Sequence, residues 1–121
     1  MKPEGSMLVG AVSEVTIDDN SQAALDAVVA RINRALGSNT YPNYHKIKKM
    51  IQVKRQIVAG NNYKFDFLMA ETDCKKSDQS VDLSECSIIN QAPSFKCSAS
   101  VLDKAWSRIR YSNIKFNCKN E

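Results

Sequence analysis

Two adjacent segments of alternating side chains constrain the fold of this chain more than any other feature. In residues 45–58 one parity is apolar, and the opposite parity is mostly Lys and Gln. The apolar set is Ile47, Ile51, Val53 and Ile57, although Lys49 and Arg55 fall on the same parity. In residues 63–71, Tyr63, Phe65, Phe67 and Met69 alternate with Lys64, Asp66, Leu68 and Ala70. The connecting residues 58–62 contain a glycine and two asparagines, which accept positive φ. These features predict a long antiparallel hairpin.

A single amphipathic helix is predicted upstream, over residues 21–36. Its apolar stripe recurs at helical spacing and consists of Leu25, Val28, Val29, Ile32 and Leu36. Asn20 or Ser21 is expected to cap the first turn, because a short side-chain oxygen accepts from free backbone N–H groups. Gly37 is expected to end the helix in the left-handed conformation.

The remaining chain predicts further strands and one long excursion. Residues 95–101 alternate as a third strand, residues 103–107 form a turn, and residues 109–116 form a last strand. Residues 74–93 are rich in polar side chains and indicate a solvated excursion. Residues 8–15 are expected to add a short edge strand. One helix followed by an antiparallel meander is an α+β fold, with the helix packed across one face of a sheet of four to five strands.

The four cysteines, Cys74, Cys86, Cys97 and Cys118, all lie in the C-terminal half. No close pair of the C-x-x-C type occurs, and the sole histidine, His45, is distant in sequence, so we expect no metal site and no cofactor. An even count without metal spacing favours two disulfides and an oxidising, extracellular environment. Four cysteines allow three pairings, and their spacing does not choose among them, although nearest-neighbour pairing closes the shortest loops.

The formal net charge of +4 is spread along the chain, with one basic cluster formed by Lys46, Lys48, Lys49, Lys54 and Arg55. The solvated face of a strand explains this cluster best. The alternative is a surface for nucleic acid or another anion, but no nucleic-acid-binding motif accompanies the cluster, so we expect no nucleic-acid partner. We expect no membrane partner either, since no apolar run approaches the roughly 18 residues that span a bilayer.

Three short motifs resemble those of the cystatin family. Gln56-Ile57-Val58-Ala59-Gly60 resembles the cystatin hairpin motif Gln-x-Val-x-Gly. Leu8-Val9-Gly10 resembles the N-terminal trunk, and Ala105-Trp106 stands where the family has Pro-Trp in a second hairpin. The cysteines are similar to those of the secreted two-disulfide (type 2) cystatins, which implies pairing of the first with the second and of the third with the fourth. The resemblance covers residues 8–118.

The resemblance implies a reversible, tight-binding inhibitor of papain-like cysteine proteases of the cathepsin type, and not an enzyme. The trunk and both hairpins would act as a three-part wedge in the active-site cleft. Ala105 in place of proline implies a modest loss of affinity, since a proline presets φ. Gly60→Arg is expected to weaken inhibition without affecting folding. The alternative is a non-inhibitory, secreted cystatin-fold binding or immunomodulatory protein.

A second protease site is implied by Ser38-Asn39-Thr40, which follows the predicted helix. Some secreted cystatins inhibit legumain through an asparagine in this place, because legumain cleaves after Asn. The family's acidic third residue is Thr40 here. The alternative interpretation is a plain turn after a helix, since Gly-Ser-Asn is common turn chemistry.

Residues 8–121 are expected to form a single cystatin domain. Residues 1–7 are interpreted as an expression remnant or a disordered N-terminus, and no signal peptide is recognised, so secretion is inferred from the cysteines. We expect a monomer, with a domain-swapped dimer opening at the first hairpin as the alternative.

Overall fold

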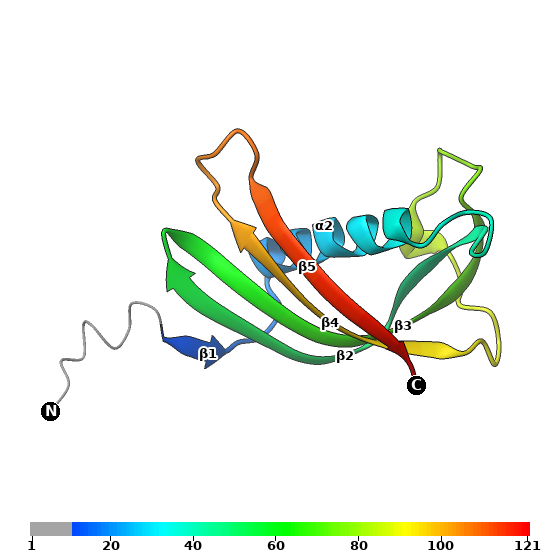
Figure 1. Ribbon diagram of the computed structural model, residues 1–121, viewed down its shortest axis with the longest axis horizontal. Helices are drawn as coiled ribbons and strands as arrows, with labels where there is room; N and C mark the ends of the chain where they lie inside the picture. The colour runs from blue at the N-terminus through cyan, green and yellow to red at the C-terminus, as the bar shows by residue number, and fades with distance from the viewer. Residues whose placement is uncertain (1–10) are drawn as a thin grey trace, which may run out of the picture.

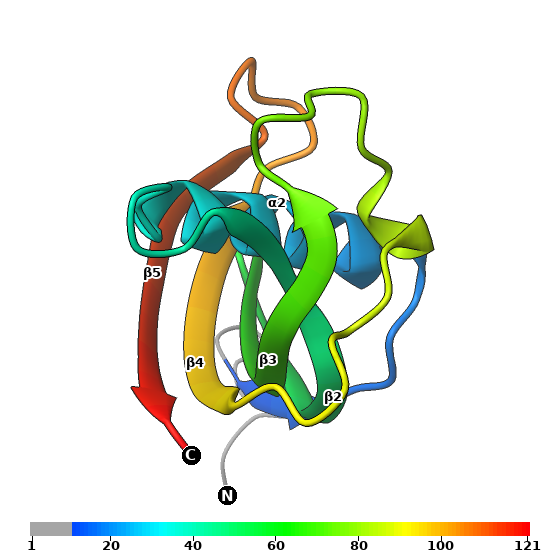
Figure 2. The ribbon, with the colours of Figure 1, turned by 90° about the vertical axis from the view of Figure 1, so that its right-hand side faces the viewer.

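Five antiparallel strands wrap around one helix in the computed structural model, which describes residues 11–121 (Figure 1). The elements are β1 (Val12–Glu14), α2 (Asp19–Ala35), β2 (Asn43–Val58), β3 (Gly60–Lys75), the short 3₁₀ helix η1 (Leu83–Glu85), β4 (Ser94–Asp103) and β5 (Tyr111–Asn120). The strands lie in sequence order, each antiparallel to the next. Figure 2 shows α2 lying across one face of the sheet, which curves around it. The predicted α+β fold is confirmed.

The N-terminus of α2 is fixed by a capping box that begins earlier than predicted. Asp18 is the N-cap, and its carboxylate accepts from the backbone N–H of Ser21 at 2.8 Å, while the Ser21 hydroxyl accepts from the Asp18 N–H at 2.8 Å. The prediction of Asn20 or Ser21 as the cap is therefore wrong. The hydrogen bonds from Ser21 lower the pKa of the Asp18 carboxyl, because they favour its charged form.

The C-terminus of α2 ends without the predicted left-handed glycine. Gly37 lies outside the positive-φ region, and Leu36 takes an extended conformation. The Lys76 ammonium instead donates to the carbonyls of Asn33, at 2.9 Å, and Leu36. A cation here satisfies helix-end carbonyls and opposes the negative end of the helix dipole. The prediction of Gly37 as a left-handed stop is therefore wrong.

The core lies between α2 and the odd-numbered side chains of β3. Leu25, Val28, Val29 and Ile32 are buried, Leu36 is half-buried, and they pack with Tyr63, Phe65, Phe67 and Met69. Both the predicted stripe and the predicted sheet-packing role of the aromatic residues are confirmed. No helix in residues 11–121 is both long and apolar enough to cross a membrane.

Two β-bulges explain the imperfect alternation of β2. The register with β3 shifts between Ile47 and Lys49 and again between Met50 and Gln52, so Lys48 and Ile51 are extra residues. Each extra residue reverses which parity faces the helix. Met50 consequently packs against the core, whereas Ile51 is 48% exposed. The prediction that Ile51 shares the face of Val53 is therefore wrong. Ile57 does share that face, since it pairs with Asn61 in the same register, but it lies near the hairpin tip and is exposed.

Two disulfides join neighbouring cysteines in sequence. Cys74 bonds Cys86 at the base of the excursion between β3 and β4, and Cys97 on β4 bonds Cys118 on β5. This is the pairing that the cystatin resemblance implies.

The last strand begins later than predicted, at Tyr111, because residues 104–110 belong to a longer loop.

A buried amide links α2 to the start of β2. The Asn33 side chain donates to the His45 carbonyl at 2.8 Å and accepts from the His45 N–H at 2.8 Å. The His45 imidazole stacks on Phe95 with ring centroids 5.4 Å apart, and its Nδ1 is buried without a hydrogen-bond partner. Burial, above all, lowers the pKa of His45 from its ordinary value of 6.5.

The buried imidazole predicts that acidification destabilises the fold. Below about pH 6.5 the unfolded chain protonates at His45 while the folded chain stays neutral, so the free energy of unfolding falls by up to about 1.4 kcal/mol per pH unit. His45→Phe should reduce this dependence of stability on pH, because phenylalanine does not bind a proton. The variant should still fold, since the bonds to Asn33 use backbone atoms of residue 45 and remain. Thermal unfolding at about pH 7.5 and about pH 5.5 measures both slopes. Equal slopes in the two proteins would contradict the assignment.

Candidate functional site

One end of the sheet brings together the β2–β3 hairpin, the β4–β5 loop and the start of β1 (Figure 1). Val58 pairs with Gly60, which leaves Ala59 at the hairpin tip. Val12 pairs with Gln56, so the chain enters its first strand beside the hairpin. The sheet register therefore places three segments that are distant in sequence at one edge.

Gly60 joins the hairpin to the β4–β5 loop. Its φ is +108°, and a Cβ built on it would lie 2.5 Å from the Asp103 carbonyl oxygen. The two loops can approach this closely only because residue 60 has no side chain. Asn61 and Asn62 lie in β3 and do not have positive φ, so the prediction that they supply turn conformations is wrong.

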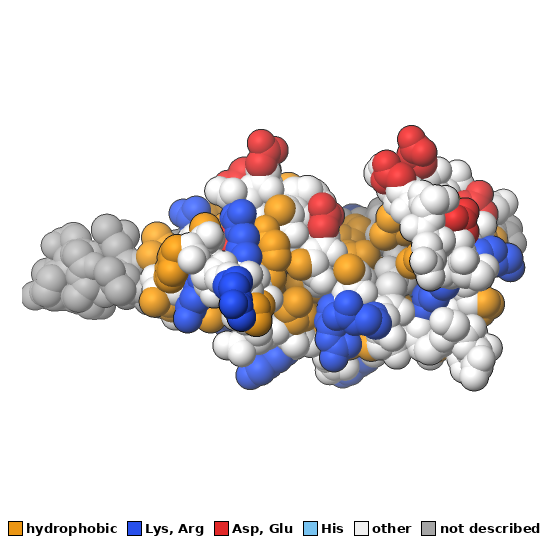
Figure 3. Space-filling view, turned by 90° about the horizontal axis from the view of Figure 1, so that it is seen from above, with side chains coloured by type: hydrophobic (Ala, Val, Ile, Leu, Met, Phe, Trp, Pro, Cys, Tyr) orange, Lys and Arg blue, Asp and Glu red, His pale blue; other side chains and the backbone are white. Residues whose placement is uncertain are grey.

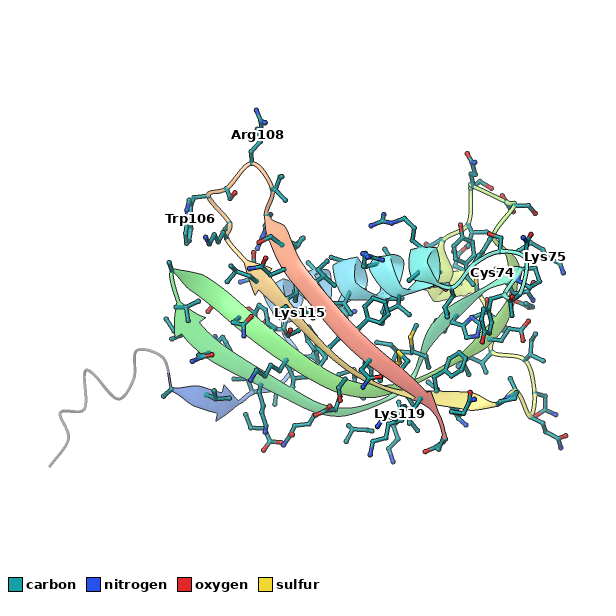
Figure 4. All side chains as sticks on the ribbon, viewed as in Figure 1. Cys74, Lys75, Trp106, Arg108, Lys115 and Lys119 are labelled. Atoms are coloured by element: carbon teal, nitrogen blue, oxygen red, sulfur yellow. A yellow bond between two sulfur atoms is a disulfide. The ribbon has the colours of Figure 1, made fainter. Side chains whose placement is uncertain are left out.

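The β4–β5 loop presents Trp106 at its outer corner. The Ser107 N–H donates to the Lys104 carbonyl at 3.0 Å, which closes a four-residue turn with Ala105 and Trp106 at its centre. Trp106 is 69% exposed, and Figure 4 shows its side chain on the outer side of the loop. A large exposed aromatic side chain on a closed turn has no role in the core.

An ion pair at the base of this loop was not predicted from the sequence. Arg110 donates to both carboxylate oxygens of Asp103, at 2.7 and 3.3 Å, and the Asp103 carboxylate is buried. Hydrogen bonding to Asp103 raises the pKa of Arg110 above its ordinary value. The Lys104 N–H also donates to the Arg110 carbonyl at 2.8 Å. These contacts tie the two limbs of the loop together directly beneath Trp106.

The surface at this end combines apolar and basic side chains. Figure 3 shows hydrophobic side chains gathered toward the hairpin end, with lysines and arginines among them. The exposed large hydrophobic residues of the edge are Val12, Ile57, Val58, Trp106 and Ile109. Exposed apolar side chains grouped on neighbouring loops indicate a surface for binding another molecule. Leu8, Val9 and Gly10, the predicted trunk, lie outside the described residues.

The second predicted site lies at the opposite end of the molecule (Figure 1). Ser38, Asn39 and Thr40 form an exposed turn after α2. The N–H groups of Thr40 and Tyr41 donate to the Gly37 carbonyl at 3.2 and 2.8 Å. The turn is therefore held by its own backbone and presents Asn39 to solvent.

Within residues 11–121 the side chains offer no nucleophile of the Cys–His type. All four cysteines are in disulfides, and the His45 ring is buried against Phe95. Asp73, Cys74 and Cys86 place their ligand atoms within 4.8 Å of one another, but a disulfide has no thiolate to offer a metal. The arrangement of the edge suits binding better than catalysis.

Comparisons with known proteins agree with the fold and with the motifs. The family model described as Cystatin domain matches residues 10–106. Cystatin-1 of Chilobrachys guangxiensis is 30% identical over 94% of this chain and 84% of its own length. Cystatin-C of Mus musculus is 31% identical over 97% of this chain and 82% of its own length.

Solved structures give the same result. The structure titled "Crystal structure of Al-CPI" has a TM-score of 0.74 at 29% identity and covers 93% of this chain and 100% of its own. Dimeric human cystatin F has a TM-score of 0.80 at 19% identity over 93% of this chain and 89% of its own, a likeness of fold.

The Gly60 contact predicts a stability loss that a matched glycine does not share. Gly60→Ala should lower the free energy of unfolding by about 1–3 kcal/mol, because a Cβ strains the positive φ and meets the Asp103 carbonyl. Gly37→Ala is the control, since a Cβ added to Gly37 would meet nothing within 4 Å and its φ is not positive. Chemical denaturation measures both changes.

Equal stability of the two alanine variants would contradict the role given to Gly60. The same contact also contradicts the expectation that Gly60→Arg leaves folding intact, since any side chain at this position meets the Asp103 carbonyl.

Proposed function

Because this chain belongs to the cystatin family, whose members inhibit cysteine proteases and are not enzymes, we propose that it is a reversible, tight-binding inhibitor of papain-like proteases of the cathepsin type. Its two disulfides fit the type 2 cystatins. The observation that carries the proposal is the close approach of Gly60 to the Asp103 carbonyl, which lets the two hairpin tips lie side by side at one edge.

The proposed mechanism is a wedge that fills the protease cleft on both sides of its thiolate. The hairpin Gln56–Gly60 would enter the centre of the cleft, where the small side chain at the Ala59 tip allows close approach of the backbone. Ala105 and Trp106 would occupy one side, with Trp106 as the anchor, since buried tryptophans dominate the binding energy of many interfaces. Leu8, Val9 and Gly10 would fill the substrate pockets on the other side.

Rigidity of the edge supports tight binding without a covalent step. Both hairpins are continuous with a five-stranded sheet, and the β4–β5 loop is closed at its base by Asp103 and Arg110. Loops that are already ordered lose little conformational entropy on docking, so more of the contact energy appears as affinity. A wedge of this kind presents no scissile bond to the thiolate.

The remaining proposals concern the setting of the inhibitor. The two disulfides favour an oxidising, extracellular environment, so we assign the protein to the secreted class. Residues 8–121 are proposed as the functional domain, with residues 1–7 outside it. A monomer is proposed as the active form, and exchange of strands through the tight Val58–Gly60 turn is the route to a dimer.

A second activity, inhibition of legumain, is proposed for Ser38-Asn39-Thr40. The support is that Asn39 stands on an exposed turn closed by backbone hydrogen bonds, which would present the asparagine as a substrate-like residue. The turn lies at the end of the molecule away from the hairpins, so the two proteases would be bound independently (Figure 1).

Trp106→Ala should weaken inhibition of papain about 30-fold or more, which corresponds to at least about 2 kcal/mol of binding free energy. The free energy of unfolding should be unchanged, because the Trp106 side chain is exposed and does not pack in the core. Ile89→Ala is the control, since Ile89 is also an exposed large hydrophobic residue but lies at the other end of the sheet, where its N–H donates to the Glu71 carbonyl. Inhibition constants from titration of papain measure the effect. Papain that stays fully active at micromolar wild-type protein would instead favour a non-inhibitory binding module.

Asn39→Lys should abolish inhibition of legumain and leave inhibition of papain unchanged, because the lysine removes the substrate-like amide. Trp106→Ala should show the reverse pattern, so each variant serves as the control for the other. Paired assays of both proteases check this. An Asn39→Lys protein that still inhibits legumain fully would refute the second site.

A further inference from the structure

The face of the sheet that points away from α2 carries a group of lysines that the proposed inhibitory edge does not use. Strand pairing aligns Lys54, Lys64, Ser100 and Lys115 in one row, and Lys49, Leu68, Lys96 and Lys119 in another. Paired residues share a face, and the odd-numbered residues of β3 face the helix. The six lysines of these rows, called here the lysine face, are Lys49, Lys54, Lys64, Lys96, Lys115 and Lys119.

A polar row with a single carboxylate separates the two lysine rows. Gln52, Asp66, Ser98 and Asn117 are paired across four strands, and the Ser98 hydroxyl donates to Asp66 at 2.6 Å. Lys54, Lys64, Lys115 and residues of this row line a shallow hollow of about 460 Å³. Figure 4 labels Lys115 and Lys119 along β5, one in each lysine row.

The lysine face keeps an excess of positive charge, because its six ammonium groups outnumber the neighbouring carboxylates Asp66, Glu14 and Glu121. Among residues 11–121 the ion pair of the structure is Arg110–Asp103, which lies on the other side of the sheet. Asp66 accepts from Ser98 and keeps its negative charge, and Glu14 on the edge strand β1 is directly opposite Lys54, so these two carboxylates offset part of the positive charge. Glu121, which donates its N–H to the Ser94 carbonyl, stands at the opposite margin.

Two cross-strand pairs within the lysine face are like-charged. Lys54 is directly opposite Lys64, and Lys96 is directly opposite Lys119. Like charges at opposed positions of an antiparallel pair destabilise the sheet. A bound polyanion would relieve this repulsion in both rows at once. It should therefore bind this face more tightly than it binds isolated lysines elsewhere on the chain.

We propose that the lysine face binds a linear sulfated polysaccharide. The rows are about 13 Å apart along the strands, and lysines within a row spread over about 10–15 Å across them, so an extended anionic chain can contact both rows. The side-chain amides of Gln52 and Asn117 in the central row can donate to sulfate and sugar oxygens between the ammonium groups. Lysine suits this recognition, because it acts as a flexible point charge.

The same observations disfavour nucleic acid and membrane. The lysine face carries no aromatic side chain on which a base could stack and no arginine for bidentate contact with a base edge. A broad sheet face presents no helix or ribbon to enter a groove. Leu68 is the one large apolar side chain of the aligned rows and is half-buried, and Ile51 of β2 is a single exposed apolar neighbour, so the face offers no apolar cluster to insert into a bilayer.

Removal of one like-charged pair tests the proposal. Lys54→Thr/Lys64→Thr is compared with Arg34→Gln/Lys75→Gln, which takes two exposed charges from elsewhere, so each variant lowers the net charge from +4 to +2. Binding of a size-defined heparin oligosaccharide is measured by calorimetry at about 50 and about 150 mM NaCl. Thermal unfolding verifies that each variant is folded, and heparin should raise the unfolding temperature of the wild type.

The lysine-pair variant should lose at least about tenfold in heparin affinity at the lower salt, with a shallower salt dependence, while the control loses less than about threefold. Equal losses would show that only net charge matters and would overturn the proposal, as would an absence of binding by the wild type. Desulfated heparin should not bind. A DNA oligonucleotide or phosphatidylserine vesicles that bind as tightly, through the same two lysines, would overturn the assignment to a polysaccharide.

Discussion

The packing of α2 against the aromatic row of β3 is the interaction on which the rest of the structure depends. Phe65 and Phe67 are almost completely buried between the sheet and the helix, and each such side chain contributes about 1.5–3 kcal/mol by burial. Because α2 is the one α-helix of residues 11–121, the sheet has to curve around it to cover its apolar stripe. The ends of the hairpins extend past this core. Their geometry therefore depends on the strand register, which pairs Asn61 with Asp103, on the absence of a side chain at Gly60 and on the Asp103–Arg110 ion pair.

The sequence was sufficient for the elements whose signal is local. A helical stripe, alternating strands and a glycine at the hairpin predicted the helix, the meander and the turn with errors of a few residues at their ends. It was insufficient where one residue changes the phase of a strand. Ile51 fits the alternation of its neighbours, yet it is the extra residue of the second bulge and is left exposed. A bulge stabilises curvature of the whole sheet, and nothing within the strand itself marks which residue is the extra one.

The contacts missed at the edge were all between residues brought together by the fold. The local sequence marks Gly60 as a turn residue. Its tertiary role, to leave room for the Asp103 carbonyl, depends on a residue 43 positions later in the chain. Lys76 bonds the helix-end carbonyls from 40 or more positions away, so the sequence around Gly37 contains no sign of it. One signal was available for the ion pair. Asp103 continues the buried parity of Cys97, Ala99 and Val101, and a buried carboxylate requires a partner, which Arg110 supplies across the loop.

That ion pair changes how the missing proline in the second loop should be weighed. Ala105 is the second residue of the Lys104–Ser107 turn, a position that proline favours because its φ is already fixed. An alanine there leaves the unfolded loop about 0.4–1 kcal/mol more entropy to lose. In this chain the loop is closed from below, by Asp103 with Arg110 and by the Lys104–Arg110 backbone bond, so order at Trp106 does not depend on residue 105 alone. The two hairpins can therefore share the proposed binding more evenly than the substitution by itself suggests.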